Sequence, residues 1–204
     1  MESMVEDLKN DTIEFNKQLR GATYAILKLD TALKIFYNDK WDDSTIKKLY
    51  IVNLGYLGRR DVYLSERTSS QLKNAGGMRL IRNQNISDQI SEYWHLAEYG
   101  KTYGEVYEEL KIHAREQSYS IFNQKYYNNI AVGAVGTSVV DGVKLMTNDK
   151  IILTEFANRL NHIRNATEKV QKVIVNRQKA AAIKLLLDIK KEYHITDKIE
   201  DEKK

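Results

Sequence analysis

The sequence predicts an all-α fold, a bundle of about five or six helices, three of them long, with two related helix–corner–helix units. Apolar residues recur at alternating steps of three and four from residue 5 to residue 36, which is the spacing of one face of a helix. Similar spacing returns over residues 83–123 and 148–193. The 204-residue chain also contains no proline, a residue that interrupts helices because it lacks a backbone N–H.

The first predicted helix carries the most regular apolar spacing in the chain. Its seam consists of Val5, Leu8, Thr12, Phe15, Leu19, Ala22, Ile26, Leu29, Leu33 and Phe36. A seam of this kind forms either a coiled-coil homodimer or the inner face of an intramolecular bundle. The intramolecular bundle is favoured, because other long helices in the chain can cover the seam, and a homodimer through this helix is the alternative.

Shorter elements follow the first helix. A second helix is expected to begin with a cap at Asp43 or Ser44 and to run to about Leu57. Glycines then break the path, and a third helix is expected over residues 61–75. Residues 125–142 are rich in small side chains and favour a tightly packed helix, although their valines also suit an extended strand.

The fourth and the last predicted helices occupy the two longer periodic stretches. Gly100 and Gly104 lie inside the first of these and are interpreted as points where helices approach each other closely. Taken together, residues 1–195 are predicted to form a single helical-bundle domain. Residues 196–204 are predicted to form a polar, disordered tail.

One phrase occurs twice in the chain. "GGMRLIRNQNI" at residues 76–86 resembles "DGVKLMTNDKI" at residues 141–151. The aligned pairs are Gly77 with Gly142, Arg79 with Lys144, Leu80 with Leu145, Ile81 with Met146, Asn83 with Asn148, and Ile86 with Ile151. Each copy contains a glycine after a predicted helix, an apolar pair and an asparagine before the next helix.

These residue types are typical of a structural corner. Gly77 and Gly142 are predicted to end helices in a left-handed conformation, because glycine has no Cβ to clash there. The apolar pairs would fill the corners, and Asn83 and Asn148 would cap the next helices. The alternative is a pair of anion-binding corners that use Arg79 and Lys144.

The stretch "ERTSSQLKNAGGMRLIRNQNISDQISEYW", with the later "LMTNDKIILTEFANRL", resembles the DUF6090 family of uncharacterised Bacteroidota proteins. In that family a similar phrase recurs within a helical domain. Its members typically carry an N-terminal transmembrane helix that leads into the first long helix. The resemblance implies a membrane anchor before Met1, on an unspecified side of the membrane, and it implies no activity, because the family has no assigned catalytic residues.

Residues that could perform catalysis are sparse. There is no cysteine, and none of the four histidines lies in a nucleophile motif. Glu92 and His95 have the spacing of half a di-iron site, but no second Glu-x-x-His accompanies them. We therefore expect no enzymatic activity, no metal and no cofactor.

Aromatic residues crowd the middle of the chain. Tyr93, Trp94, Tyr99, Tyr103 and Tyr107 fall within one predicted helix. Tyrosine and tryptophan are favoured where a surface is partly apolar and partly wet, as in protein interfaces and ligand pockets. This set predicts either a core with polar edges or a recognition surface for a protein or a small ligand.

The last predicted helix is basic, although the net charge of the chain is only +4. Counted over Ile151–Tyr193, nine lysines and arginines stand against four acidic residues. Such a bias can serve binding to nucleic acid or to an acidic protein, but no nucleic-acid motif accompanies it, so nucleic acid is not the favoured partner.

These observations favour a non-enzymatic interaction or sensing domain, tethered to a membrane through a segment outside this chain. The alternative is a cytosolic helical scaffold whose basic last helix binds nucleic acid or an acidic partner.

Overall fold

A computed structural model describes residues 1–38, 41–56, 64–65, 67–74, 76–126 and 142–196. Over these residues the protein is all-α, as predicted, and a lone antiparallel bridge between Phe122 and Leu145 is its only strand-like pairing. The helices are α1 (Glu2–Phe36), α2 (Asp43–Tyr56), α3 (Arg67–Asn74), η1 (Gly77–Leu80), α4 (Gln84–Ile121), α6 (Lys150–Ala166), η2 (Thr167–Gln171) and α7 (Lys172–Glu192). The predicted elements over most of 125–142 and the predicted tail lie largely outside the described residues.

The chain divides into two compact units. Unit 1 contains Met1–Leu19, Val62–Lys101 and Ile174–Lys204, and unit 2 contains Arg20–Asp61 and Thr102–Val173. Each unit has its own hydrophobic core, described separately below. The single domain predicted over residues 1–195 stays a prediction.

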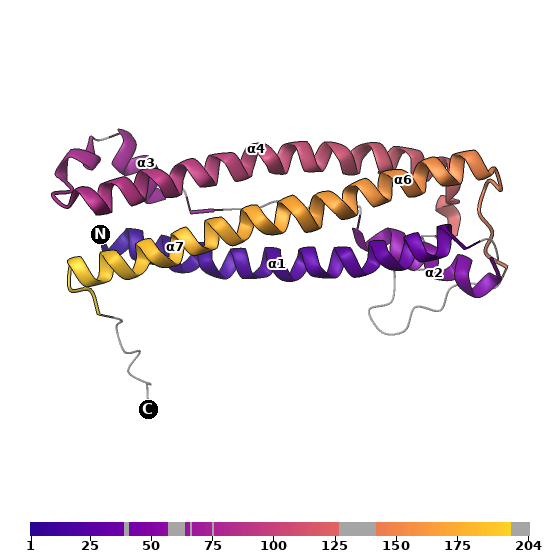
Figure 1. The fold of residues 1–204 in the computed structure, drawn as a ribbon, viewed down its shortest axis with the longest axis horizontal. Helices are drawn as coiled ribbons and strands as arrows, with labels where there is room; N and C mark the ends of the chain where they lie inside the picture. The colour runs from indigo at the N-terminus through magenta and orange to yellow at the C-terminus, as the bar shows by residue number, and fades with distance from the viewer. Residues whose placement is uncertain (39–40, 57–63, 66, 75, 127–141, 197–204) are drawn as a thin grey trace, which may run out of the picture. The chain divides into compact units, whose positions relative to one another are not determined.

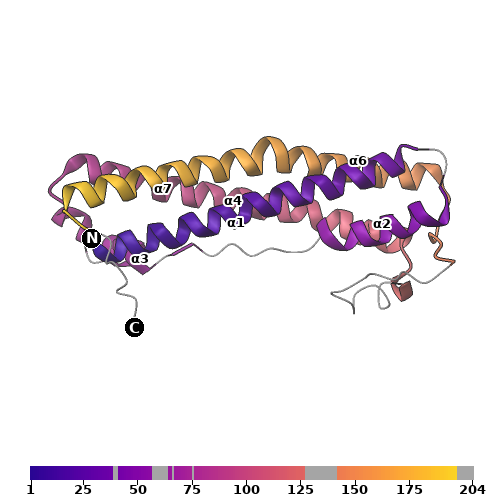
Figure 2. The same cartoon turned by 90° about the horizontal axis from the view of Figure 1, so that it is seen from below.

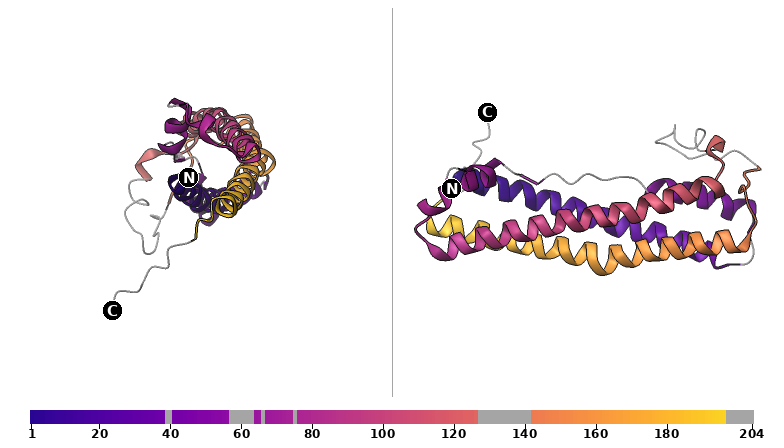
Figure 3. Two further views of the ribbon diagram at one scale, coloured as in Figure 1. Left: turned by 90° about the vertical axis from the view of Figure 1, so that its left-hand side faces the viewer. Right: turned by 90° about the horizontal axis from the view of Figure 1, so that it is seen from above.

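The core of unit 1 is built by α1, α4 and α7 (Figures 1 and 3). Its buried residues are Met4, Val5, Leu8, Phe15, Ile81, Ile86, Ile90, Tyr93, Val175, Ala182, Leu185 and Ile189. Residues from three long helices and from the η1 corner therefore converge on one apolar interior, which provides the main favourable term for folding.

The core of unit 2 combines α1, α2, α4 and α6, and α2 turns back along the C-terminal part of α1 (Figure 2). Its aromatic centre includes Phe156, whose ring meets those of Phe36 and Phe122 edge-on at centroid distances of 5.6 and 5.9 Å. Edge-to-face contacts are favourable beyond the area that they bury.

The seam of α1 lies in these two cores, which confirms the intramolecular interpretation. Val5, Leu8 and Phe15 are buried in unit 1, and Leu29 and Leu33 are buried in unit 2. The alternative, a homodimer through α1, stays a prediction.

The second helix is capped one residue earlier than predicted. Oδ1 of Asp42, rather than the side chain of Asp43 or Ser44, accepts hydrogen bonds from the Thr45 N–H at 2.8 Å and the Ser44 hydroxyl at 3.0 Å. The Asp42 N–H donates in return to Oγ1 of Thr45, which completes a reciprocal capping box. The bond from the Thr45 N–H lowers the pKa of Asp42.

The caps of the two repeated corners differ from the prediction at one position. Oδ1 of Asn83 accepts from the Ile86 N–H at the start of α4, as predicted. At the start of α6 the cap is Asp149 and not Asn148, because Oδ1 of Asp149 accepts from the N–H groups of Ile151 and Ile152. Both residue types can cap, and the extended backbone at Asp149 selects it.

The left-handed glycines are Gly76 and Gly142, with φ of 63° and 76°. Gly142 was predicted, whereas Gly76 takes the role expected of Gly77. Gly77 is needed for space, because a Cβ there would lie 2.9 Å from Cδ2 of Leu72. The interval from Gly76 to the cap Asn83 equals the interval from Gly142 to the cap Asp149. The two corners therefore superpose with an offset one residue longer than the offset in the sequence alignment.

The apolar pairs fill the corners only in part. Ile81 is buried and Leu145 is half-buried, whereas Leu80 is 82% exposed and Met146 is also exposed. Arg79 and Lys144, the residues of the anion-binding alternative, are exposed.

Tyr50 of α2 fastens the second corner inside unit 2. Its fully buried hydroxyl donates to the carbonyl oxygen of Lys144 at 3.0 Å and accepts from the N–H of Asn123 at 2.8 Å. Its ring lies edge-on to Phe122 at 5.1 Å. One side chain therefore provides a hydrogen-bond partner for two backbone groups that lie outside the helices.

We expect Tyr50→Phe to lower the free energy of unfolding by roughly 1–3 kcal/mol, because it leaves both backbone groups without their partner. Urea denaturation followed by circular dichroism measures the change. Tyr37→Phe is the matched control, since Tyr37 is 59% exposed, and equal effects of the two substitutions would show that the Tyr50 hydroxyl is not a fastening point.

Candidate interaction surface of α7 and α4

One half of α7 faces the interior of unit 1. Its buried residues are Ile174, Val175, Gln178, Ala182, Leu185 and Ile189. An α-helix turns about once every 3.6 residues, so some of the residues between these positions, such as Ala181 and Leu186, lie at the edge of the core and others are exposed.

The opposite half of α7 carries an exposed apolar stripe, which we define as Ala180, Ile183 and Leu187. Ile183 is 36% exposed, Leu187 is 60% exposed, and Ala180 is also exposed. Their steps of three and four residues match the spacing of a coiled-coil seam. The helix therefore has an apolar core face and a second, smaller apolar face toward solvent.

Cations flank the stripe on both sides. Arg177, Lys184 and Lys191 lie along one side and are exposed, and Lys179 lies along the other. The acidic residues of α7 are Asp188 and Glu192. Asp188 is turned toward α4, where its Oδ2 accepts a hydrogen bond from Nε2 of Gln89 at 2.8 Å.

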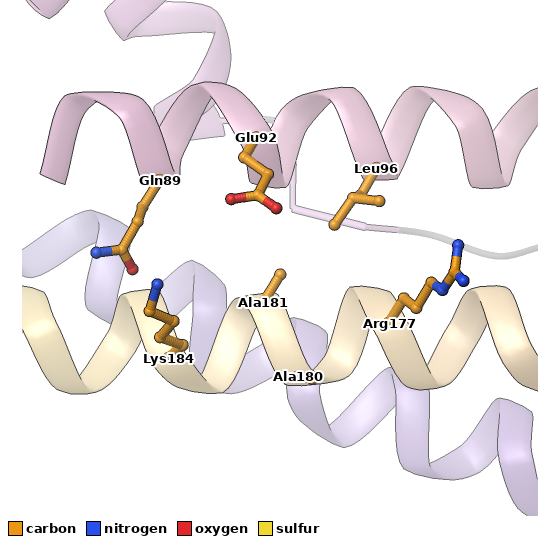
Figure 4. A pocket seen from close by; sticks show the side chains of 7 residues that line it. All are labelled: Gln89, Glu92, Leu96, Arg177, Ala180, Ala181 and Lys184. Carbon is orange, nitrogen blue, oxygen red and sulfur yellow. The ribbon is translucent and has the colours of Figure 1, made fainter. Parts of the chain in front are cut away.

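A groove of about 430 Å³ runs between α4 and α7 beside the stripe (Figure 4). It is lined by Gln89, Glu92, Leu96, Arg177, Ala180, Ala181 and Lys184. The side chain of Ala181 points from α7 toward α4, and Glu92 and Lys184 extend from opposite helices (Figure 4). Because Ala180 belongs to both features, the groove and the stripe make one continuous surface.

A buried glutamine fixes α7 against α4 at the edge of this groove. Nε2 of Gln178 donates to the carbonyl oxygen of Leu96 at 3.0 Å. Gly100 gives the amide its space, because a Cβ there would lie 2.1 Å from Nε2. The interpretation of Gly100 as a close approach is thus confirmed, whereas Gly104 has nothing within 4 Å of a Cβ and is not such a point.

The predicted aromatic residues are divided between the two units and differ in exposure. Tyr93 is 4% exposed and belongs to the core of unit 1. The prediction that it lies on an interaction surface is therefore wrong for this residue. Trp94 is half-buried against the same core, and Tyr99 is exposed. In unit 2, Tyr103 is half-buried, and the half-buried Tyr107 shares a 2.6 Å hydrogen bond with the hydroxyl of Thr167.

A buried carboxylate that sequence reasoning missed lies in unit 1. Asp11 of α1 is buried and accepts hydrogen bonds from the Tyr93 hydroxyl at 2.5 Å and from the Ser65 N–H at 2.8 Å. One turn earlier, Oδ2 of Asp7 accepts from the Thr68 N–H at 3.1 Å. The two aspartates attach the start of α3 to α1, and burial raises the pKa of Asp11 despite its hydrogen bonds.

Among the residues that the structure describes, no three histidine, aspartate or glutamate side chains come together in a way that could hold a metal ion. Within the same residues, no helix has the length and apolar character needed to cross a membrane. Comparison of the chain with known protein families, with curated proteins and with solved structures found no match. The resemblance to the DUF6090 family therefore stays a prediction.

The fold and this surface define a helical protein with an exposed, cation-flanked apolar stripe. Exposed apolar side chains and positive charge lie next to each other on this surface, a combination that suits binding.

We expect Asp11→Asn to change the pH dependence of stability. A carboxyl group whose pKa is raised on folding binds more protons when folded, so its ionisation lowers stability as the pH rises above its usual 3.8. Asparagine can accept from the Ser65 N–H and donate to the Tyr93 hydroxyl without titrating. In urea denaturation from pH 4 upward, the free energy of unfolding of the variant should therefore rise relative to that of the parent protein until the pH passes the folded-state pKa. A relative rise in the stability of the parent protein over this range would contradict the assignment.

We expect Gly100→Ala and Gly104→Ala to act in opposite directions. The first should destabilise by roughly 1–3 kcal/mol, because the new methyl group displaces the buried Gln178 amide. The second should stabilise by roughly 0.5–1 kcal/mol, because alanine is favoured over glycine in a helix and finds open space. Each serves as the other's control in thermal and chemical denaturation, and a shared sign would refute the close packing at Gly100.

Proposed function

We propose that the protein is a non-enzymatic helical interaction module, which binds a protein partner through the stripe and groove of α7 and α4. The observation that carries this proposal is the exposure of Ile183 and Leu187 at coiled-coil spacing on a helix whose other face is already buried. Exposed apolar residues that follow one another along a helix are typical of a surface awaiting a partner.

The charged flanks support the same function. A polar rim around an apolar centre is the usual composition of a protein interface that forms and dissociates. A nucleic-acid surface would use the cations alone and would gain little from Leu187. The proposed membrane tether rests on the family resemblance alone. The proposed interaction does not depend on the side of the membrane on which the domain lies.

Site-specific photo-crosslinking tests the interaction function. Benzoylphenylalanine is placed at Leu187 in the full chain, the protein is produced in its native host, and adducts are detected by an upward shift on denaturing gels. Ile13 of α1 is the matched control, because it also lies in unit 1 and is 54% exposed.

We expect discrete adducts from Leu187 and none from Ile13. A chain that gives no adduct at Leu187, or the same diffuse adducts at both positions, would remove the α7 surface as the site of interaction.

A further inference from the structure

We infer that the partner presents an acidic amphipathic helix, which lies along the stripe of α7 and places its carboxylates beside the flanking cations. This inference rests on the proposed function and adds the chemical class of the partner. Three features of unit 1 lead to it: the spacing of the apolar residues, the sign of the charges on both flanks, and the groove next to the stripe.

The apolar spacing selects a helix as the occupant. Ala180, Ile183 and Leu187 follow steps of three and four, so they line up along one side of α7 as a seam. Asn176, one step earlier, is also exposed and continues the line with a polar side chain. A partner helix with leucines at the same spacing would match the seam, whereas an extended strand, with its period of two, would not.

The flanking charges select an acidic partner. Arg177, Lys184 and Lys191 occupy the positions beside the seam on one flank, and Lys179 occupies the other. In paired helices these positions face the corresponding positions of the partner. A second copy of α7 would set cation against cation in both the parallel and the antiparallel orientation, so like-charge repulsion opposes a homodimer through this face.

The groove provides room on the side of α4. Leu96 and Ala181 give it an apolar wall, and Arg177 and Lys184 stand at its edge. Glu92 of α4 lines the same groove and is exposed (Figure 4). Its negative charge opposes an acidic partner, so the proposed geometry makes a specific prediction: neutralising Glu92 strengthens binding.

Fluorescence anisotropy with designed peptides tests the inference on the full chain. The probe is a labelled helical peptide with leucine at the seam positions and glutamate on both flanks. Its controls are a peptide of the same composition in scrambled order and a peptide with lysine in place of glutamate. Labelled duplex DNA and vesicles of anionic lipid are titrated in parallel at the same ionic strength.

We expect saturable binding of the acidic amphipathic peptide and none of the scrambled or basic peptides. The double substitution Arg177→Glu, Lys184→Glu should weaken binding at least about tenfold, as should Leu187→Asp, and Glu92→Gln should tighten it severalfold. The matched control is Arg82→Glu, Lys101→Glu, which makes the same change in net charge at exposed positions of unit 1 away from the stripe.

Rescue separates a loss of contact from a loss of folding. The Arg177→Glu, Lys184→Glu protein should bind the peptide with lysine flanks, which a misfolded protein would not do. Equal weakening by the control pair would reduce the effect to net charge and overturn the inference. Binding of DNA or of vesicles through Leu187, with no binding of the acidic peptide, would overturn it in favour of a different partner.

The two proposals fail in different ways. If crosslinks form at Leu187 but the acidic peptide does not bind, the interaction function stands and the partner class is wrong. If no crosslink forms there, the interaction function itself fails.

Discussion

The rotation of α7 about its own axis is the constraint on which the candidate surface depends. Each residue along an α-helix turns the direction of the side chain by about 100°. The Gln178 amide, bonded to the Leu96 carbonyl oxygen and fitted against Gly100, holds α7 at one setting. At that setting Leu185 and Ile189 point into the core while Ile183 and Leu187 point out. A rotation by a single residue, about 100°, would already turn Leu185 and Ile189 away from the centre of the core.

Polar contacts set the arrangement in both units, while apolar burial supplies most of the driving force. In unit 1, Asp11 holds the backbone before α3 and the hydroxyl of Tyr93. In unit 2, Tyr50 holds one backbone group at the end of α4 and another in the second corner. Hydrogen bonds to backbone groups outside helices have few alternative partners, so they select one arrangement among those that bury similar apolar area.

The fold class and the long helices could be predicted from the sequence, because the apolar residues of α1 leave one consistent seam. The corners could be predicted only approximately. Asn148 and Asp149 are equally able to cap a helix, and backbone conformation decides between them. Gly76 and Gly77 present the same ambiguity.

The candidate surface was beyond what periodicity could identify. The stretch from Ala180 to Leu187 contains apolar residues on every side of the helix, so no single face stands out. Asp11 gave equally little signal, since a charged residue next to an apolar seam is ordinarily exposed. Both become visible only when partners from distant parts of the chain, Tyr93 for Asp11 and Leu96 for Gln178, are in place.

The short π-helix between α6 and α7 shifts the helical periodicity by one residue. Within Thr167–Gln171 the Lys172 N–H bonds to the carbonyl oxygen of Thr167, five residues back, so the turn contains one residue more than an α-turn. Phe156 and Ile163 are buried in unit 2, and the buried residues Gln178 and Leu185 of unit 1 follow them at an interval of 22 residues, one more than three heptads. The length of this turn therefore helps to set which side chains of α7 are exposed. Removing the extra residue would change the exposed surface of α7 without changing the sequence of that helix.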